Sequence, residues 1–136
     1  MWNRRVSWAV GWIAALAGCS ADPGVLRVGA YAAGEERGAR QTSTGDRVEY
    51  TLFVPQATEG LPGPPWPAVL LMHGFGRDKG YHKYNAAYLA SRGFVVLTPD
   101  GVTLLGGETG QRRNIANVGD HVRWLQQRSE TPGDSL

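Results

Sequence analysis

The stretch that most constrains the fold runs from Pro67 to Gly76, where an apolar segment of strand length ends in a histidine and a glycine-rich turn. A continuous apolar run is typical of a strand that is buried on both faces of a parallel sheet. A sharp turn at the carboxyl end of such a strand presents backbone N–H groups at the crevice where α/β proteins bind ligands. The sequence therefore predicts a ligand-binding crevice directly after Met72.

A helix and a second apolar strand follow this turn. Tyr81–Arg92 predicts a helix that contains three alanines, and Gly93 is placed to end it. We expect the tyrosines of this helix to pack against the sheet. Phe94–Thr98 predicts a second buried strand. A strand, a helix and a strand of these lengths form a βαβ unit whose strands are parallel in nearly all known cases, so the sequence indicates an α/β fold.

Further strands are expected before the apolar run. Arg47–Pro55 alternates apolar with polar residues, as a strand with one buried face does. Val25–Tyr31 is another strand candidate, and we interpret the polar segment Ala32–Gly45 as a loop. Gly60–Pro67 holds four of the eight prolines, which indicates a stiff, extended connector. These segments predict antiparallel strands that lead into a mixed sheet.

The end of the chain predicts a loop and a second helix. The glycine-containing segment Val102–Arg113 is expected to form a loop beside the crevice. Asn114–Arg128 predicts a helix with one apolar face, formed by Val118, Val122 and Leu125.

Composition excludes several classes of protein. The chain has 136 residues, enough for one short domain, and its 42% apolar and 19% charged residues are typical of a folded globular protein. A net charge of +2 without a basic stripe argues against a nucleic-acid partner. Cys19 is the single cysteine, so an internal disulfide and a cysteine-based metal cage are both impossible. We expect neither a cofactor nor a metal.

The first nineteen residues resemble an export signal. Two arginines, Arg4 and Arg5, precede the apolar run Val6–Leu16, which is shorter than the ~20 apolar residues that span a bilayer. Leu-Ala-Gly-Cys at 16–19 is similar to the lipobox of bacterial lipoproteins, in which the cysteine is lipidated. The resemblance implies that a lipid on Cys19 anchors the chain on the outer side of a bacterial membrane. An ordinary cleaved signal, which would give a secreted protein, and a buried helix with an incidental cysteine are the alternatives.

Three segments, in this order, carry a resemblance to a known family: His-Gly-Phe-Gly at 73–76, Gly-Phe-Val-Val-Leu-Thr-Pro-Asp at 93–100, and Asp-His-Val-Arg-Trp-Leu at 120–125. Together they resemble the N-terminal half of an α/β-hydrolase, closest in character to dienelactone hydrolases, cutinases and lipase-like exported esterases. The resemblance implies antiparallel lead-in strands, a parallel βαβ unit and a further helix. It divides the chain into a signal at 1–19, a linker with a lead-in strand at 20–46, and a partial hydrolase domain at 47–136.

The resemblance also implies a role for the crevice turn in hydrolysis of a small or polymeric ester. By that resemblance, Phe75 donates its backbone N–H to the oxyanion hole. Gly74 and Gly76 let the chain bend and let a substrate approach the backbone. His73 is then a structural residue of the loop and not the catalytic base.

The catalytic triad of the family is absent from the sequence. The nucleophile of α/β-hydrolases lies in a Gly-x-Ser-x-Gly turn on the strand after the second helix. None of the six serines, at positions 7, 20, 43, 91, 129 and 135, has glycines two positions away on both sides. We therefore expect the chain to end just short of the nucleophile strand and to be inactive as it stands.

Three other functions fit parts of the sequence. Glycines 74, 76 and 80 after a strand, with Asp100 at the end of the next strand, resemble a dinucleotide-binding turn, although the last glycine spacing differs from that motif. His73, His82 and His121 are candidates for a metal site, but their spacing matches no ligand pattern. A surface-anchored binding protein without catalysis is the third alternative.

Two carboxylates near the expected crevice allow structural roles. Asp100 either orients the crevice loop or caps its own turn with Gly101, and turn capping is the more common role. Asp120 is expected in the first turns of the last helix, where it would favour the helix dipole.

A chain that lacks the nucleophile strand would leave Val69–Met72 as an apolar, unprotected sheet edge. We expect the protein from Ser20 onward to bind a hydrophobic dye such as ANS or to precipitate. A sharp, cooperative melt of a monomer, followed by circular dichroism, would count against a missing strand.

Overall fold

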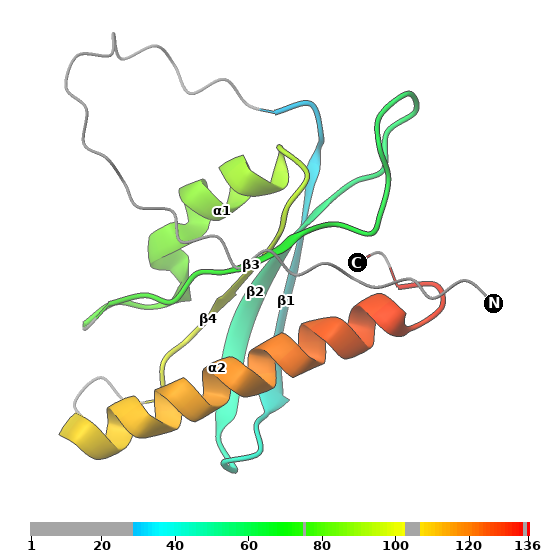
Figure 1. Cartoon of the computed structure of the whole chain (residues 1–136). Helices are drawn as coiled ribbons and strands as arrows, with labels where there is room; N and C mark the ends of the chain where they lie inside the picture. The colour runs from blue at the N-terminus through cyan, green and yellow to red at the C-terminus, as the bar shows by residue number, and fades with distance from the viewer. Residues whose placement is uncertain (1–28, 75, 103–106, 135) are drawn as a thin grey trace, which may run out of the picture.

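The computed structural model describes residues 29–74, 76–102, 107–134 and 136, so the leader, Cys19 and Phe75 lie outside the described residues. Within these ranges, a mixed sheet has the strand order β1–β2–β4–β3 (Figure 1). Its strands are β1 (Ala33–Gln41), β2 (Arg47–Pro55), β3 (Ala68–Leu70) and β4 (Val95–Pro99). β2 is antiparallel to β1 and β4, whereas β3 and β4 are parallel. The expected α/β class, mixed sheet and parallel βαβ unit are confirmed.

Helices cover both faces of this sheet. A short 3-10 helix, η1 (Lys79–His82), leads into α1 (Lys83–Ala90), and α2 (Gly107–Glu130) follows β4. Val96 of β4 packs with α1, whereas its neighbours Val95 and Leu97 pack on the side of α2. Successive side chains of a strand point to opposite faces, so α1 and α2 lie on opposite sides of the sheet, as Figure 1 shows. None of the helices in the described part of the chain combines the length and apolarity that crossing a bilayer requires.

Small residues, and not tyrosines, hold α1 against the sheet. Ala86 and Ala90, one turn apart, are fully buried against Phe53 and Val96. Tyr81 and Tyr84 are 56% and 86% exposed, so the expectation that the tyrosines pack against the sheet was wrong for these two, whereas Tyr88 is half-buried. Tyr81 lies in η1, and Tyr84 lies two residues before Ala86, on the other side of α1.

Gly93 ends the helix segment as predicted. Its φ is +91°, a value that side chains disfavour, and its N–H donates to the carbonyl oxygen of Ala90. β4 then begins at Val95, one residue later than the expected strand start at Phe94, and all five of its residues are buried.

The predicted boundary and buried face of the second helix were wrong. α2 begins at Gly107 instead of Asn114, so residues 107–113 of the expected loop are helical, while 103–106 lie outside the described residues. The buried face holds Leu125 but otherwise the small or polar residues Gly110, Asn117, Asp120 and His121, and Val122 is 38% exposed. An apolar periodicity could not reveal this face because polar side chains form most of it.

The polar segment expected to be a loop contains β1. It pairs with the whole of β2, from Ala33 opposite Pro55 to Gln41 opposite Arg47. Gly29–Tyr31, the described part of the other strand candidate, is not a strand. β1 lies at the edge of the sheet, where charged side chains are typical because they discourage pairing with another chain. That polarity hid the strand from the sequence analysis.

The apolar run yields a shorter strand than its pattern predicts. β3 covers only Ala68–Leu70 and is exposed to half-buried, so the expectation of burial on both faces was wrong. Within the described ranges it pairs with β4 alone and forms the second edge of the sheet. Beyond it, the Leu71 N–H still donates to the carbonyl of Leu97 at 2.9 Å, which carries the chain to the crevice.

Replacing a fully buried β4 side chain should destabilise the protein strongly. Leu97 is 0% exposed, so Leu97→Ala removes buried methyl groups and leaves a cavity. We expect it to lower the free energy of unfolding by about 2–5 kcal/mol in urea titration. The control Tyr84→Ala, at an exposed position, should change it by no more than about 0.5 kcal/mol. Equal losses in both variants would contradict this core.

Candidate functional site at the carboxyl ends of β3 and β4

His73 joins the ends of the two parallel strands. Its side chain is 5% exposed, and its Nε2 accepts the Gly101 N–H at 2.8 Å. An amide N–H can only donate, so the proton of the neutral ring is on Nδ1, which donates to the Gly74 carbonyl at 3.0 Å. Both ring nitrogens are therefore engaged within the loop. This geometry ties the loop after β3 to the end of β4 and leaves His73 poorly placed to act as a base.

Asp100 fastens the start of η1 to the same end of the sheet. Its carboxylate accepts the Lys79 backbone N–H at 2.6 Å and the Lys79 ammonium at 2.8 Å. The Lys79 ammonium also donates to Glu49 at 2.8 Å. The hydrogen bond to Asp100, and to a lesser extent that to Glu49, raise the pKa of Lys79 above its usual value. The carboxylate thus orients the crevice loop, and the favoured prediction of capping its own turn was wrong.

The turn between His73 and η1 has the conformational features expected of it. Gly76 has a φ of +71°, which favours glycine, and the Arg77 N–H donates to the Gly74 carbonyl at 3.2 Å. A Cβ atom at Gly74 or Gly76 would have no contact within 4 Å, so the backbone there faces open space. Phe75 lies outside the described residues, and its backbone role stays a prediction.

Asn114 connects the crevice to α2 and was missed by the sequence analysis. Its Oδ1 accepts the Val102 N–H at 2.9 Å, so α2 holds the loop that follows β4. The only sequence signal was a polar residue at the predicted start of a helix, which is too common to suggest this contact.

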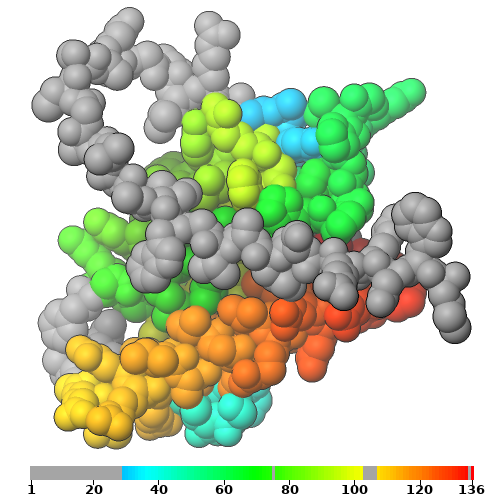
Figure 2. All heavy atoms as spheres, in the orientation of Figure 1, coloured from blue at the N-terminus to red at the C-terminus, as the bar shows by residue number. Residues whose placement is uncertain are grey.

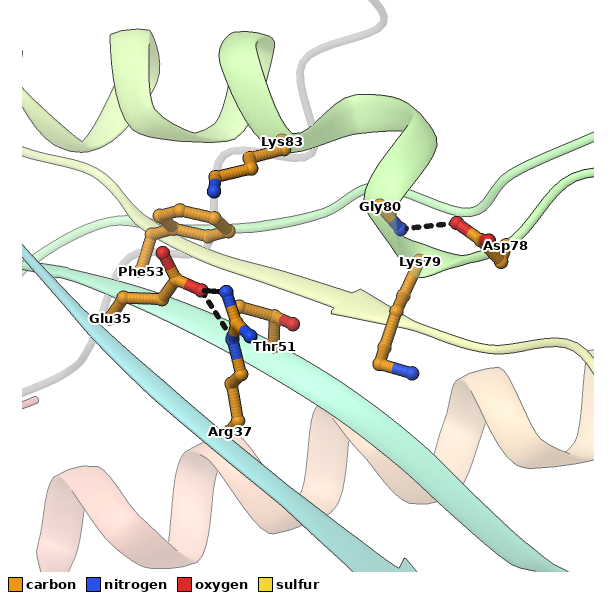
Figure 3. Close-up of a pocket in the computed structure, with 8 residues that line it drawn as sticks. All are labelled: Glu35, Arg37, Thr51, Phe53, Asp78, Lys79, Gly80 and Lys83. Carbon is orange, nitrogen blue, oxygen red and sulfur yellow. Dashed lines mark hydrogen bonds and ion pairs between the residues drawn. The ribbon is translucent and has the colours of Figure 1, made fainter.

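A pocket of about 240 Å³ lies beside Lys79, on the α1 side of the sheet (Figure 3). Phe53 and Thr51 of β2 lie at its base, and Lys83 of α1 extends beside the Phe53 ring. The other lining residues are Glu35, Arg37, Asp78, Lys79 and Gly80. Within the pocket Arg37 pairs with Glu35, and Asp78 accepts the Gly80 N–H at 2.7 Å. The cavity has the size and mixed polarity to hold a small polar group, and the sequence analysis did not identify it.

No serine hydroxyl is hydrogen-bonded to a histidine within the described ranges. Ser91 and Ser129 donate to backbone carbonyls. Ser43 donates from both its hydroxyl and its backbone N–H to Asp120, each at 2.6 Å. Although Ser43, Asp120 and His121 are triad residue types, the serine bonds directly to the acid and has no base.

Asp120 lies in the middle of α2 and not in its first turns. Besides Ser43 it contacts Arg123. The hydrogen bonds from Ser43, the hydroxyl first, lower its pKa to about 2, with Arg123 acting in the same direction. The expected interaction with the helix dipole was therefore wrong, and Asp120 instead joins α2 to the β1–β2 turn.

The metal and dinucleotide alternatives find little support. His82 bonds to the Met72 carbonyl at 3.2 Å, and the part of the chain that the structure describes contains no group of three or more histidines, cysteines or acids able to hold a metal. Both carboxylate oxygens of Asp100 are held by Lys79, so this acid is not free to bind a ribose.

Neither of two comparisons with known proteins found a match. No model of a protein family matches the sequence, and no curated protein matches it either. The chemistry of the site follows from the residues of this chain.

Removing the acceptor on His73 should loosen the crevice. His73→Leu leaves the Gly101 N–H without its partner, which should cost about 1–3 kcal/mol of folding free energy and speed exchange of the Gly101 amide. His73→Gln, which keeps an acceptor, should lose less in both respects. Urea unfolding and NMR hydrogen exchange measure the two effects. Unchanged Gly101 exchange in His73→Leu would contradict the tie.

Proposed function

We propose that this chain carries the crevice-forming part of a serine ester hydrolase of α/β-hydrolase type. The observation that supports this most is the hydrogen bond from the Gly101 N–H to His73, which fixes the His-Gly turn at the carboxyl ends of two parallel strands. Ligands of open α/β sheets bind at that end. In this proposal the turn points the backbone N–H of Phe75 at the reacting carbonyl oxygen.

A fixed backbone donor suits acyl transfer because negative charge develops on that oxygen in the transition state. A donor oriented before the reaction stabilises the charge without having to reorganise, and removing one such donor costs about 2.7–4 kcal/mol of transition-state stabilisation. The bonds from His73 and Asp100 supply that rigidity on either side of the turn. The open space at Gly74 and Gly76 leaves room for an acyl group.

The sheet order also agrees with the proposal. In the α/β-hydrolases that the sequence resembles, the nucleophile strand lies next to the strand that precedes the His-Gly turn. Here that strand is β3, and its outer edge has no strand partner among the described residues. A strand carrying a Gly-x-Ser-x-Gly turn could therefore pair with β3 and bring its serine to the crevice.

Catalysis needs a nucleophile and a base that the described residues do not supply. We therefore propose that the crevice becomes active only with that further strand. By the resemblance of its leader, we further propose export and a lipid anchor on Cys19, which would direct the enzyme to small or polymeric esters outside the membrane.

A binding protein without catalysis is the second candidate, and the pocket beside Lys79 favours it.

The coding DNA beyond Leu136 tests the proposal directly. We expect a reading frame, continuous or resumed after a frameshift, that encodes an apolar strand and Gly-x-Ser-x-Gly within about 20 residues, the usual distance from a helix to the next strand. A stop with no such strand beyond it would eliminate ester hydrolysis and leave the binding protein.

In the protein that includes this strand, Phe75→Pro removes the proposed backbone donor. We expect kcat for p-nitrophenyl esters to fall by about 100- to 1,000-fold with little change in KM. Phe75→Ala keeps the N–H and is the matched control, expected to retain kcat within about tenfold. The 136-residue chain alone should not react with a fluorophosphonate. A similar kcat in the proline and alanine variants would refute the oxyanion role.

A further inference from the structure

A buried histidine joins α2 to β1 on the face of the sheet opposite the pocket beside Lys79. His121 is 0% exposed, and its Nδ1 lies 3.0 Å from a guanidinium nitrogen of Arg40. A guanidinium can only donate, so Nδ1 must accept and must be unprotonated. Arg40 is held in place because its guanidinium also stacks on the ring of Trp124 at 5.4 Å. The contact therefore forms only with neutral His121.

The other ring nitrogen has no hydrogen-bond partner among the described residues. With Nδ1 accepting, the proton of the neutral ring is on Nε2, a buried atom. The carboxylate of the preceding residue, Asp120, has one oxygen held by Ser43 and the other by Arg123. A protonated His121 would thus have two buried N–H groups without an acceptor and a positive charge beside Arg40.

Every element around His121 contributes charged or titratable groups. The β1–β2 turn lies against the N-terminal half of α2, and Figure 2 shows it emerging beneath that helix. The groups on these packed elements are Arg40 and Glu36 on β1, Asp46 in the turn, Tyr50 on β2, and Arg113, Asp120, Arg123 and Arg128 on α2. Asp46 is engaged by Arg113 and Glu36 by Arg128, so neither acid is available to a protonated His121.

We propose that the Arg40–His121 contact is an acid-sensitive latch that holds α2 on the sheet. A proton that binds Nδ1 removes its lone pair from the hydrogen bond with Arg40 and places two cations against each other. This repulsion is relieved when α2 leaves β1 and the β1–β2 turn, because water can then reach both the guanidinium and the imidazolium. Release would uncover Trp124 and Leu125 and would also withdraw Asn114 from the crevice loop.

The direction of the pH effect follows from the state of the ring. Burial, and then the charge of Arg40, lower the pKa of His121 from 6.5 to about 4, while Asp120 opposes them. At a pH between these two pKa values, His121 is therefore protonated in the unfolded chain and neutral in the folded chain. Stability is full above pH 6.5 and falls as the pH drops toward 4. The pKa of Asp120, about 2, keeps that carboxylate ionised across this window.

Unfolding of the whole chain between pH 7.5 and 4 at constant ionic strength tests the latch. One extra proton taken up on unfolding should raise the unfolding equilibrium constant about tenfold for each unit that the pH falls between 6.5 and about 4. His121→Gln stays neutral and can still accept from Arg40, so it should lose this tenfold slope relative to the wild type. His82→Gln is the matched control and should keep it. Equal slopes in the wild type and His121→Gln would overturn the proposal.

Two measurements keep the test decisive if His121→Gln does not fold. The NMR titration of the His121 ring in the wild-type protein should show a midpoint well below 6.5, and a midpoint at or above 6.5 would overturn the proposal. Hydrogen exchange at pH 5 should show α2 amides losing protection before those of β2 and β4. Simultaneous loss would show global acid unfolding and no latch. Arg40→Met removes the opposing cation and should weaken the slope.

Discussion

The structure depends on the burial of β4 from every side. β4 pairs with β2 on one edge and with β3 on the other, while Val96 faces α1 and Leu97 faces the side of α2. Apolar side chains drive that burial, and backbone pairing on both edges satisfies the strand. Asp100 and Gly101 follow directly, so the groups that hold Lys79 and His73 come straight after a buried strand that is paired on both edges. The crevice derives its position from this strand.

The two faces of the sheet are held by different forces. On one, alanines bring α1 close to apolar strand residues. On the other, α2 adds a few apolar contacts to a polar network that includes Asp120 with Ser43 and Arg128 with Glu36. These partly buried polar contacts add little net stability, because water would satisfy the same groups, but they penalise any other register of the helix. The geometry of α2 is therefore specific and dependent on charge.

The sequence predicted the elements whose patterns are local. β2 was predicted to its ends, and β4, α1 and the Gly93 cap follow from apolar runs and a glycine. β1 was missed because its edge position makes it polar, although its partner β2 is the next strand along the chain. The early start of α2 was missed because its first turns contact distant residues, such as Arg113 with Asp46, 67 residues apart. At the crevice, His73 and Asp100 were identified, but Lys79 and Asn114 were not, since nothing local distinguishes a lysine or asparagine that fastens a loop.

The alanine contact of α1 has a consequence for the crevice at a distance. Ala86 and Ala90 are fully buried against Phe53 and Val96, so a larger side chain at either position would push the helix away from the sheet. Because η1 continues directly into α1, a wider spacing between helix and sheet would move the Lys79 ammonium and N–H away from Asp100. The position of Lys79 at the crevice thus depends on the small size of the alanine side chains between α1 and the sheet. A change at Ala86 would impair the site by displacing it, with every crevice residue still present.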